Sequence, residues 1–328
     1  MKTVLSGIRA TGRLHFGSYL GAVSHFVNFQ RSGDARCMYF VADFHTLTTL
    51  DNPSELRDNL LEIVKDYLAA GLDPDKSIIY AQSSIPEIAT LSMYLGMLQP
   101  LGELERIPTF KDLIRKNPDR VTHGLVSYPV LMAADILGTQ ANIVPVGSDQ
   151  IPNVELARNL AVNFNKRYGN TFTIPRMLEE MVKVPGLDGG KMGKSESENA
   201  IGLSMSKDEI LARYRKGVTD SSRVKKNDPG DPQNCLSVFP VHRLVSTGDQ
   251  ITEVSSRCKS GSIGCSECKA LLVRNIWNIL EPFQDRRAKL ADQDKMVKEI
   301  LHEGGKKARE IILPTIEMVA DKMGIVTY

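Results

Sequence analysis

Short apolar runs in the first half of the chain predict a set of buried strands. The runs lie at residues 3–8, 37–43, 77–82 and 141–147. Segment 52–71, between the second and third runs, repeats apolar residues at helical spacing, with Pro53 near its start and Gly71 as its stop. Strands that alternate with helices indicate an open parallel sheet covered by helices, which is a doubly wound, Rossmann-like α/β fold.

The second half of the chain has a different pattern. Residues 149–169 follow the last apolar run with a helical pattern, and residues 175–200 are so rich in Pro, Gly and Lys that we expect a mobile loop. Strand patterns largely stop after residue 205, and further helices are predicted over 206–216, 268–280 and 305–323. We therefore expect a catalytic domain over residues 1–200, which includes the loop, and a smaller, all-helical domain over residues 201–328.

Composition narrows the class of protein without naming a function. The chain of 328 residues is 42% hydrophobic and 24% charged, as is usual for a soluble globular protein. No apolar run approaches the roughly 18–20 residues that a membrane helix needs, and the N-terminus does not resemble a signal peptide. We expect a cytoplasmic protein that does not engage a membrane. A net charge of +2 permits a nucleic-acid partner but does not argue for one.

Two short motifs have the composition of phosphate-binding segments. The first, "GIRATGRLHFGSYLGA" at residues 7–22, follows the first strand and leads into a helix, whose N-terminus offers free N–H groups to an anion. The second, "KMGKS" at residues 191–195, places two lysines three residues apart on a glycine-rich loop. Taken alone, the first could be an ordinary strand–helix turn with an incidental histidine, and the second a solvated basic loop.

Together, and in this order, the two motifs make the chain resemble the class I aminoacyl-tRNA synthetases. "HFGS" stands in the place of the His-Ile-Gly-His signature, and "KMGKS" stands in the place of Lys-Met-Ser-Lys-Ser. Within that class the chain is most similar to bacterial tryptophanyl-tRNA synthetases. The similar stretches are "FVADFHTLT" (40–48), "LERIPTFKD" (104–112), "YPVLMAADIL" (128–137), "VPVGSDQ" (144–150) and "DPGDPQNC" (228–235). Three residues depart from the family pattern, namely Arg9, Ser18 and Gly193.

The resemblance implies a tryptophan–tRNA ligase that uses ATP and Mg²⁺. Its substrates and partners would be L-tryptophan, ATP and tRNA(Trp), and the chain would form a homodimer. His15, Lys191 and Lys194 would be catalytic. The residues implied to bind ATP are Arg9, Ala10, Thr11, His15, Gly17, Ser18, Gly147, Ser148, Asp149, Val182, Lys191, Met192, Gly193, Lys194 and Ser195.

The helix that contains "YPVLMAADIL" carries the candidate tryptophan site. Tyr128, Met132 and Asp135 are four and three residues apart, so they share a helix face on which one carboxylate ends an apolar surface. Such a surface suits an indole ring, whose only polar atom is an N–H donor, and the resemblance implies that Asp135 accepts this hydrogen bond. Further candidates for this pocket are His45, Val144 and Gln150.

Four cysteines predict a metal site in the second domain. Cys235, Cys258, Cys265 and Cys268 give the spacing C-x22-C-x6-C-x2-C. Four thiolates suit either one zinc ion or a [4Fe–4S] cluster, and a single C-x2-C pair argues only weakly against zinc. The resemblance goes further, because a subset of bacterial tryptophanyl-tRNA synthetases carries this pattern and binds a [4Fe–4S] cluster. We expect a structural cluster that shapes the anticodon-binding surface.

Three other functions fit parts of the pattern. A tyrosyl-tRNA synthetase would share the fold and the chemistry, whereas a small nucleotidylyltransferase would share only the first motif. A non-catalytic synthetase paralogue would explain Ser18 and Gly193. In the synthetase interpretation, the basic segment 213–217 and the cluster of Arg223, Lys225 and Lys226 are candidates for contact with tRNA phosphates, although solvated helix faces explain them as well.

Overall fold

The computed structural model describes residues 1–116, 121–178, 182–193 and 198–325. The chain forms two compact units. Unit 1 comprises residues 1–12, 25–181 and 292–328, and unit 2 comprises residues 13–24 and 182–291. This division by contacts differs from the expected division at residue 200, because the last part of the chain returns to unit 1. Which residues bind tRNA stays a prediction.

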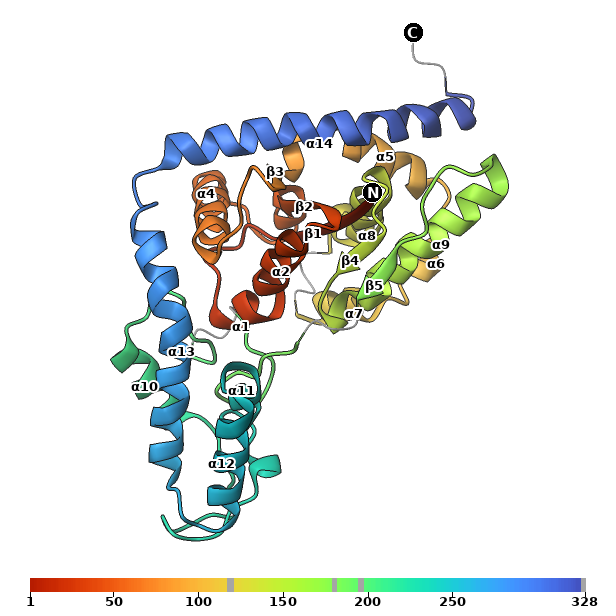
Figure 1. Ribbon diagram of the computed structural model, residues 1–328. Helices are drawn as coiled ribbons and strands as arrows, with labels where there is room; N and C mark the ends of the chain where they lie inside the picture. Colours follow the sequence, from red (N-terminus) through yellow and green to blue (C-terminus); the bar gives the residue numbers. More distant parts are fainter. Residues whose placement is uncertain (117–120, 179–181, 194–197, 326–328) are drawn as a thin grey trace. The chain divides into compact units, whose positions relative to one another are not determined.

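Within the described residues, unit 1 is built on a five-stranded parallel sheet (Figure 1). The strands are β1 (Lys2–Ile8), β2 (Ala35–Val41), β3 (Ser77–Ala81), β4 (Ile143–Pro145) and β5 (Arg176–Leu178), in the order β3-β2-β1-β4-β5. The first four confirm the predicted strands. The fifth lies in the segment predicted as a loop, where three residues pair with β4 but show no alternation that would reveal a strand. The Rossmann-like α/β class is confirmed.

The helices of unit 1 cover this sheet. They are α2 (Ser24–Ser32), α3 (Asp43–Thr46), α4 (Pro53–Ala70), α5 (Glu87–Gly96), α6 (Leu101–Leu104), α7 (Pro108–Lys116), α8 (His123–Gly138), α9 (Ile151–Tyr168) and α14 (Asp294–Lys322). The start and stop signals of α4 act as predicted, because the Asn52 side chain accepts two backbone N–H groups and Gly71 ends the helix at φ 109°. Core residues such as Leu91, Ala133 and Ile312 are fully buried between these helices and the sheet.

Helix α14 begins well before the predicted residue 305. Two adjacent glycines, Gly304 and Gly305, weaken the helical pattern there. The structure uses them for close packing, because a Cβ at Gly304 would lie 1.8 Å from the carbonyl oxygen of Ile79 in β3. Figure 1 shows α14, in blue, running past β3. Its packing on β3 explains why the chain beyond residue 292 belongs to unit 1.

Unit 2 is helical. Its elements are α1 (Phe16–Ser18), the π turn η1 (Tyr19–Val23), α10 (Lys207–Lys216), the short turn η5 (Pro232–Asn234), α11 (Phe239–Val245), α12 (Gly248–Lys259) and α13 (Cys265–Ala288). Helix α10 confirms the prediction for 206–216, and α13 continues past the predicted end at 280 with Pro282 inside it. Among the helices of the described residues, none combines the length and the apolarity needed to cross a membrane.

The chain reverses its direction across the sheet between β1 and β4, the strands at the centre. In open α/β sheets ligands bind in the crevice at the carboxyl ends of the strands on either side of this switch point. The two ends lie side by side, since the Ser6 hydroxyl donates to the carbonyl oxygen of Pro145 at 2.9 Å. Two predicted ATP-binding segments, 9–11 and 147–149, follow β1 and β4 directly.

Candidate active site

The turn that carries "HFGS" lies in unit 2 and is organised by its histidine. The Nδ1 atom of His15 accepts the backbone N–H of Ser18 at 3.2 Å, and its Nε2 atom lies 2.9 Å from the Ser18 hydroxyl. Because Nδ1 is an acceptor, the proton of the neutral ring is on Nε2, which therefore donates to the hydroxyl. Ser18, which departs from the family pattern, thus orients His15.

The loop that carries "KMGKS" (residues 191–195), which we call the lysine loop, contacts this turn within unit 2. The backbone N–H of Gly17 donates to the sulfur of Met192 at 3.2 Å, and Met192 is only 2% exposed. The N–H of Phe16 donates to the carbonyl oxygen of Ile201 at 2.8 Å, beyond the loop. A side chain at residue 17 would meet His15 and Met192 at 3.0 Å, so the contact requires glycine. The two motifs are therefore in direct contact.

The remaining residues of the loop differ in how they are placed. Lys191 is exposed, and its backbone pairs with Pro185 on the opposite side of the loop. Among the described residues, the atom nearest to a Cβ built at Gly193 is the carbonyl oxygen of Lys191, at 3.9 Å. Val182 is 39% exposed at the start of the segment. Lys194 and Ser195 lie outside the described residues.

The segment after β1 is fixed by threonines of unit 1. The N–H of Ala10 donates to the Thr46 hydroxyl at 2.8 Å, and Arg9 donates to the hydroxyls of Thr48 and Thr49. Burial lowers the pKa of Arg9, although the side chain stays within the range in which arginine is charged. Thr11 is exposed beside this segment.

The segment after β4 forms a tight turn in unit 1. The N–H of Gln150 donates to the carbonyl oxygen of Gly147 at 2.8 Å, and Ser148 and Asp149 are exposed. A Cβ at Gly147 would lie 2.8 Å from a carboxylate oxygen of Asp149, an exposed side chain that can move to make room for it. The side chains of Ser148 and Asp149 are therefore presented at the carboxyl end of β4, as the prediction requires.

The predicted tryptophan residues surround a buried polar group in unit 1. Asp135 on α8 is 2% exposed, and its Oδ2 atom accepts a hydrogen bond from Gln82 Nε2 at 2.7 Å. The same glutamine uses its oxygen to accept from His45 Nδ1 at 3.1 Å. The His45 ring meets the Tyr128 ring edge to face, with 6.4 Å between centroids. We call Asp135, Gln82 and His45 the buried polar triad.

The other members of the predicted pocket are apolar or peripheral. Tyr128 and Met132 are half-buried and pack against the core. Val144 is 2% exposed in the core of β4. Gln150 accepts a hydrogen bond from Asn153 at 2.8 Å. Sequence reasoning missed Gln82, whose only signal was a polar residue at the carboxyl end of the third predicted strand.

Burial shifts the pKa values of the two titratable members of the triad, Asp135 and His45. It raises the pKa of Asp135 well above its usual value, against the effect of the Gln82 hydrogen bond. It lowers the pKa of His45 to about 4, with Gln82 and the backbone of Tyr128 opposing the shift. The imidazole is therefore neutral at physiological pH. The neutral His45 ring brings no positive charge to the surroundings of Asp135.

The low pKa of His45 predicts a loss of stability in mild acid. The unfolded chain takes up this proton near pH 6.5, whereas the folded chain does so only near its pKa of about 4. The stability that neutral His45 contributes is thus complete above pH 6.5 and is lost progressively between about pH 6.5 and 4. His45→Asn should reduce the difference in unfolding free energy between pH 7.5 and pH 5 by about 2 kcal/mol. Urea unfolding at both pH values measures it, with the exposed His302→Gln as control. A difference as large as that of the wild type would contradict the neutral state.

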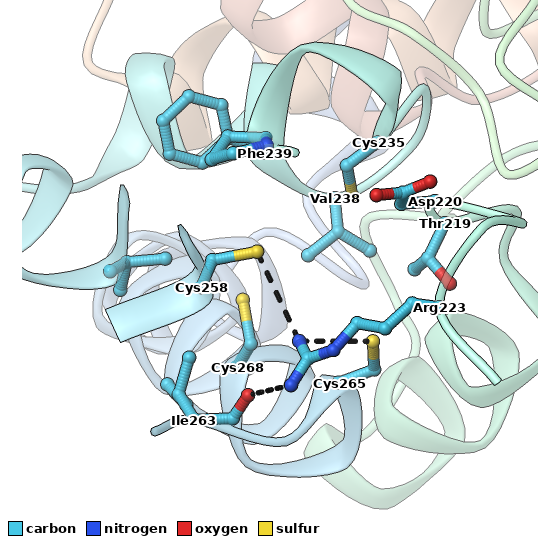
Figure 2. Close-up of a pocket in the computed structure, with 12 residues that line it drawn as sticks. Thr219, Asp220, Arg223, Cys235, Val238, Phe239, Cys258, Ile263, Cys265 and Cys268 are labelled. Atoms are coloured by element: carbon cyan, nitrogen blue, oxygen red, sulfur yellow. Dashed lines mark hydrogen bonds between the residues drawn. The ribbon is translucent and has the colours of Figure 1, made fainter. Parts of the chain in front are cut away.

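The four cysteines of the predicted metal site line one cavity in unit 2, which Figure 2 shows. Cys235 follows η5, Cys258 lies on α12, and Cys265 and Cys268 lie in the first turn of α13. Burial, together with the neighbouring thiols, raises the pKa of Cys268 to about 12. Burial likewise raises the pKa of Cys235 and Cys258. Cys235, Cys258 and Cys268 are therefore protonated thiols at neutral pH.

Comparison with known proteins agrees with this geometry. Residues 1–281 match the family model of the class I tRNA synthetases (W and Y). The chain is 39% identical to the tryptophan–tRNA ligase of Thermotoga maritima, over 98% of this chain and 99% of that protein. It is 34% identical to the tryptophan–tRNA ligase of Aquifex aeolicus, over 98% and 99% of the two chains.

Solved structures lead to the same family. The tryptophanyl-tRNA synthetase of Campylobacter jejuni, solved as a complex with ADP and tryptophan, superposes with a TM-score of 0.84 at 35% identity and covers 98% of this chain and 99% of its own. The enzyme of Mycoplasma pneumoniae gives a TM-score of 0.85 at 26% identity, over 99% and 98%. The chain therefore belongs to the class I tRNA synthetases for tryptophan and tyrosine, among the tryptophan–tRNA ligases.

Proposed function

We propose that this chain activates L-tryptophan with ATP and transfers it to tRNA(Trp). First, a carboxylate oxygen of tryptophan attacks the α-phosphorus, which gives tryptophanyl adenylate and releases pyrophosphate. A ribose hydroxyl at the 3′ end of the tRNA then attacks the acyl carbon, and AMP leaves. The buried polar triad carries this proposal, because Gln82 fixes Asp135 as a buried hydrogen-bond acceptor on the same helix as the half-buried Tyr128 and Met132.

The first step needs positioning and charge stabilisation, with no covalent enzyme intermediate. We assign the phosphates of ATP to His15, Ser18 and the N–H of Gly17. In the structure this N–H donates to a thioether sulfur, a weak acceptor that a phosphate oxygen can replace when the loop shifts. Residues 147–149 are assigned to the adenosine end. Mg²⁺ would be held mainly by the phosphates and water, because Asp149 is the only carboxylate among the residues assigned to ATP.

The lysine loop is assigned to the departing pyrophosphate. Lys191 and Lys194 would offset its negative charge as the bond to the α-phosphorus breaks. Met192, which packs against the turn at Gly17, would set the distance of the loop from the phosphates. Val182, Gly193 and Ser195 complete the proposed ATP contacts.

Gly193→Ser should restore the family residue without disturbing the fold. The structure leaves space for a side chain at this position, and a non-glycine residue narrows the conformations of the free loop. We expect about a 2- to 5-fold faster adenylation, the range that this entropy implies. Pre-steady-state formation of adenylate measures it. Gly189→Ser is the comparison variant in the same segment. It should destabilise the protein, because Gly189 has a φ of +84° and a Cβ there would lie 2.6 Å from the Cβ of Leu236. A rate below that of the wild type would contradict the assignment.

Transfer to tRNA tests the second half of the proposal. The protein should charge a tRNA(Trp) transcript with labelled tryptophan and leave a tRNA(Tyr) transcript uncharged. Charging of tRNA(Tyr) with tyrosine would instead support the tyrosyl enzyme. Adenylate formation without any charging would support a paralogue that no longer acts on tRNA.

We further propose that residues 201–291, the part of the predicted second domain that lies in unit 2, bind the anticodon. The protein would act as a homodimer in the cytoplasm. Lys225 and Lys226 are exposed and remain candidates for contact with tRNA phosphates. Arg223 is withdrawn from that set, because its guanidinium lies in the cysteine cavity. The similarity to tryptophan–tRNA ligases supports tRNA(Trp) as the partner.

We propose that the cysteine cavity holds a [4Fe–4S] cluster. One zinc ion, with Zn–S bonds of about 2.3 Å, would need all four sulfurs within about 4 Å of one another. Among the described His, Cys, Asp and Glu side chains, no group of three is placed to hold a metal ion of any kind. A cluster binds each cysteine through a different iron, so thiols spread around one cavity fit it better. When bound, it would cross-link η5, α12 and α13.

Cys265→Ser should remove the iron and spare the first reaction. The cysteine cavity belongs to a part of unit 2 that contains none of the residues assigned to tryptophan or ATP. We expect anaerobically purified wild type to hold about four irons per chain. The variant should lose them and show weaker aminoacylation with nearly unchanged adenylate formation. Cys37→Ala, which changes a buried cysteine of unit 1, should keep its iron. Wild type with one zinc per chain, or a folded variant that cannot form adenylate, would contradict this account.

A further inference from the structure

An arginine occupies the cavity formed by the four cysteines. Arg223 extends into it, and Figure 2 shows its guanidinium between Cys258 and Cys265. The Nη1 atom lies 3.9 Å from the sulfur of Cys258 and 3.8 Å from that of Cys265. The Nη2 atom donates to the carbonyl oxygens of Lys226 at 2.6 Å and Ile263 at 2.5 Å. One edge of the guanidinium is therefore fixed by the backbone, while Nη1 faces sulfur.

The surroundings of Arg223 do not balance its charge by direct pairing. Within the described part of the chain no ion pair is recorded for this guanidinium, and its Nε atom is buried without a hydrogen-bond partner. An arginine is always protonated in proteins, and neutral thiols are poor acceptors for it. Thiolates that bind iron are negatively charged and accept hydrogen bonds more strongly. Asp220 also lines the cavity, and a hydrogen bond from the backbone of Asp231, aided by the charge of Arg223, lowers its pKa, so this carboxylate offsets part of the positive charge. The Nη1 atom of Arg223 still faces the two sulfurs, where an anionic group held by the cysteines would accept its hydrogen bonds.

The backbone around Arg223 is shaped to keep this arrangement. A Cβ at Gly230 would lie 3.1 Å from both the Arg223 side chain and the Cys258 sulfur, so the glycine leaves room for both. Gly261, at φ +74°, approaches the carbonyl oxygen of Asn227 so closely that a Cβ would lie at 2.2 Å. These contacts hold the segment that carries Arg223 against the turn that carries the cysteines.

We propose that Arg223 is the charged hydrogen-bond donor to the ligand sulfurs of Cys258 and Cys265 and thereby sets the reduction potential of the iron–sulfur centre. This inference rests on the cluster proposed above. The potential of such a centre depends on net charge and on hydrogen bonds to its sulfurs. Positive charge beside the sulfurs stabilises the reduced state, which carries one more electron, so Arg223 raises the potential.

The test compares the midpoint potentials of four anaerobically reconstituted proteins. Redox titration with dithionite, followed by EPR of the reduced cluster, is applied to wild type, Arg223→Gln, Arg223→Lys and Lys259→Gln. Lys259 is the matched control, because it is exposed and adjoins Cys258 in sequence. We expect a clearly more negative potential for Arg223→Gln, a smaller shift for Arg223→Lys, which keeps the charge, and the wild-type value for Lys259→Gln.

The possible outcomes separate the inference about Arg223 from the proposal that the cysteine cavity holds a cluster. Wild type that binds no iron would overturn both. Iron-loaded Arg223→Gln with the wild-type potential would overturn only the role of Arg223. Folded apo-protein that no longer loads iron in both Arg223 variants, while Lys259→Gln does, would make Arg223 a residue needed for cluster assembly and would overturn its role in setting the potential. Unfolded apo-protein in both Arg223 variants would assign the residue to the fold and overturn the inference.

Discussion

Lys194→Ala should lower the rate of adenylate formation by about 10²–10³-fold, the cost of removing one preorganised charge that acts on the transition state. The affinity for tryptophan should change little, because the residues assigned to the indole, Asp135 and its partners, lie outside the lysine loop. Single-turnover kinetics with saturating ATP gives the rate, and equilibrium dialysis with labelled tryptophan gives the affinity.

The matched control for this prediction is Lys183→Ala. Lys183 is exposed and lies in the same segment of unit 2, so its replacement removes the same charge without touching the motif. We expect its adenylation rate to stay within a few-fold of the wild type. Equal losses of rate and of tryptophan affinity in Lys194→Ala would make that lysine structural.

Asp135→Ala should lose selectivity for tryptophan over phenylalanine by about 10- to 100-fold, which corresponds to one hydrogen bond to a charged or strongly polar group. Asp135 is the buried acceptor of the triad, and phenylalanine lacks the N–H that it would accept. The ratio of kcat/KM values for the two amino acids in pyrophosphate exchange measures the effect.

Asp135→Asn separates recognition from the loss of the triad. The asparagine keeps an oxygen that can accept from Gln82 Nε2, whose bond to Asp135 is 2.7 Å long. The oxygen that accepts from Gln82 leaves only the Nδ2 donor for the indole N–H, so this variant should keep the triad but still lose selectivity, whereas alanine also leaves the buried Gln82 amide unpaired. Unchanged discrimination in a folded Asp135→Ala protein would rule out the assigned role.

Hydrophobic periodicity and glycine or proline signals predicted much of the fold. The first four strands and helix α4 follow from local patterns, since Asn52 and Gly71 cap the helix through nearby backbone groups. The misses have physical causes. Strand β5 is three residues long and exists only because β4 pairs with it. The early start of α14 depends on the close approach of Gly304 to Ile79, a tertiary contact that helix propensity does not contain.

The candidate site was predictable where function lies in a contiguous motif. "HFGS" and "KMGKS" identified the turn and the loop, and their contact through Gly17 and Met192 follows from the fold. Residues joined only in space were missed. Gln82 links His45 to Asp135, yet in sequence it is one polar residue at a strand end.

Arg223 shows the same limit for the basic surface. A charge run predicts a solvated or phosphate-binding surface, but the fold directs this one guanidinium to sulfur and carbonyl acceptors. Its neighbours Lys225 and Lys226 are exposed. The difference depends on the position of the turn at Ile263, which lies far along the chain.

ATP–pyrophosphate exchange with each of the twenty amino acids tests the central claim most directly. Purified, iron-replete protein should support exchange with tryptophan and show at most traces with tyrosine and phenylalanine. That result follows from a buried acceptor for an indole N–H. Exchange driven by tyrosine, or no exchange with any amino acid, would contradict the account.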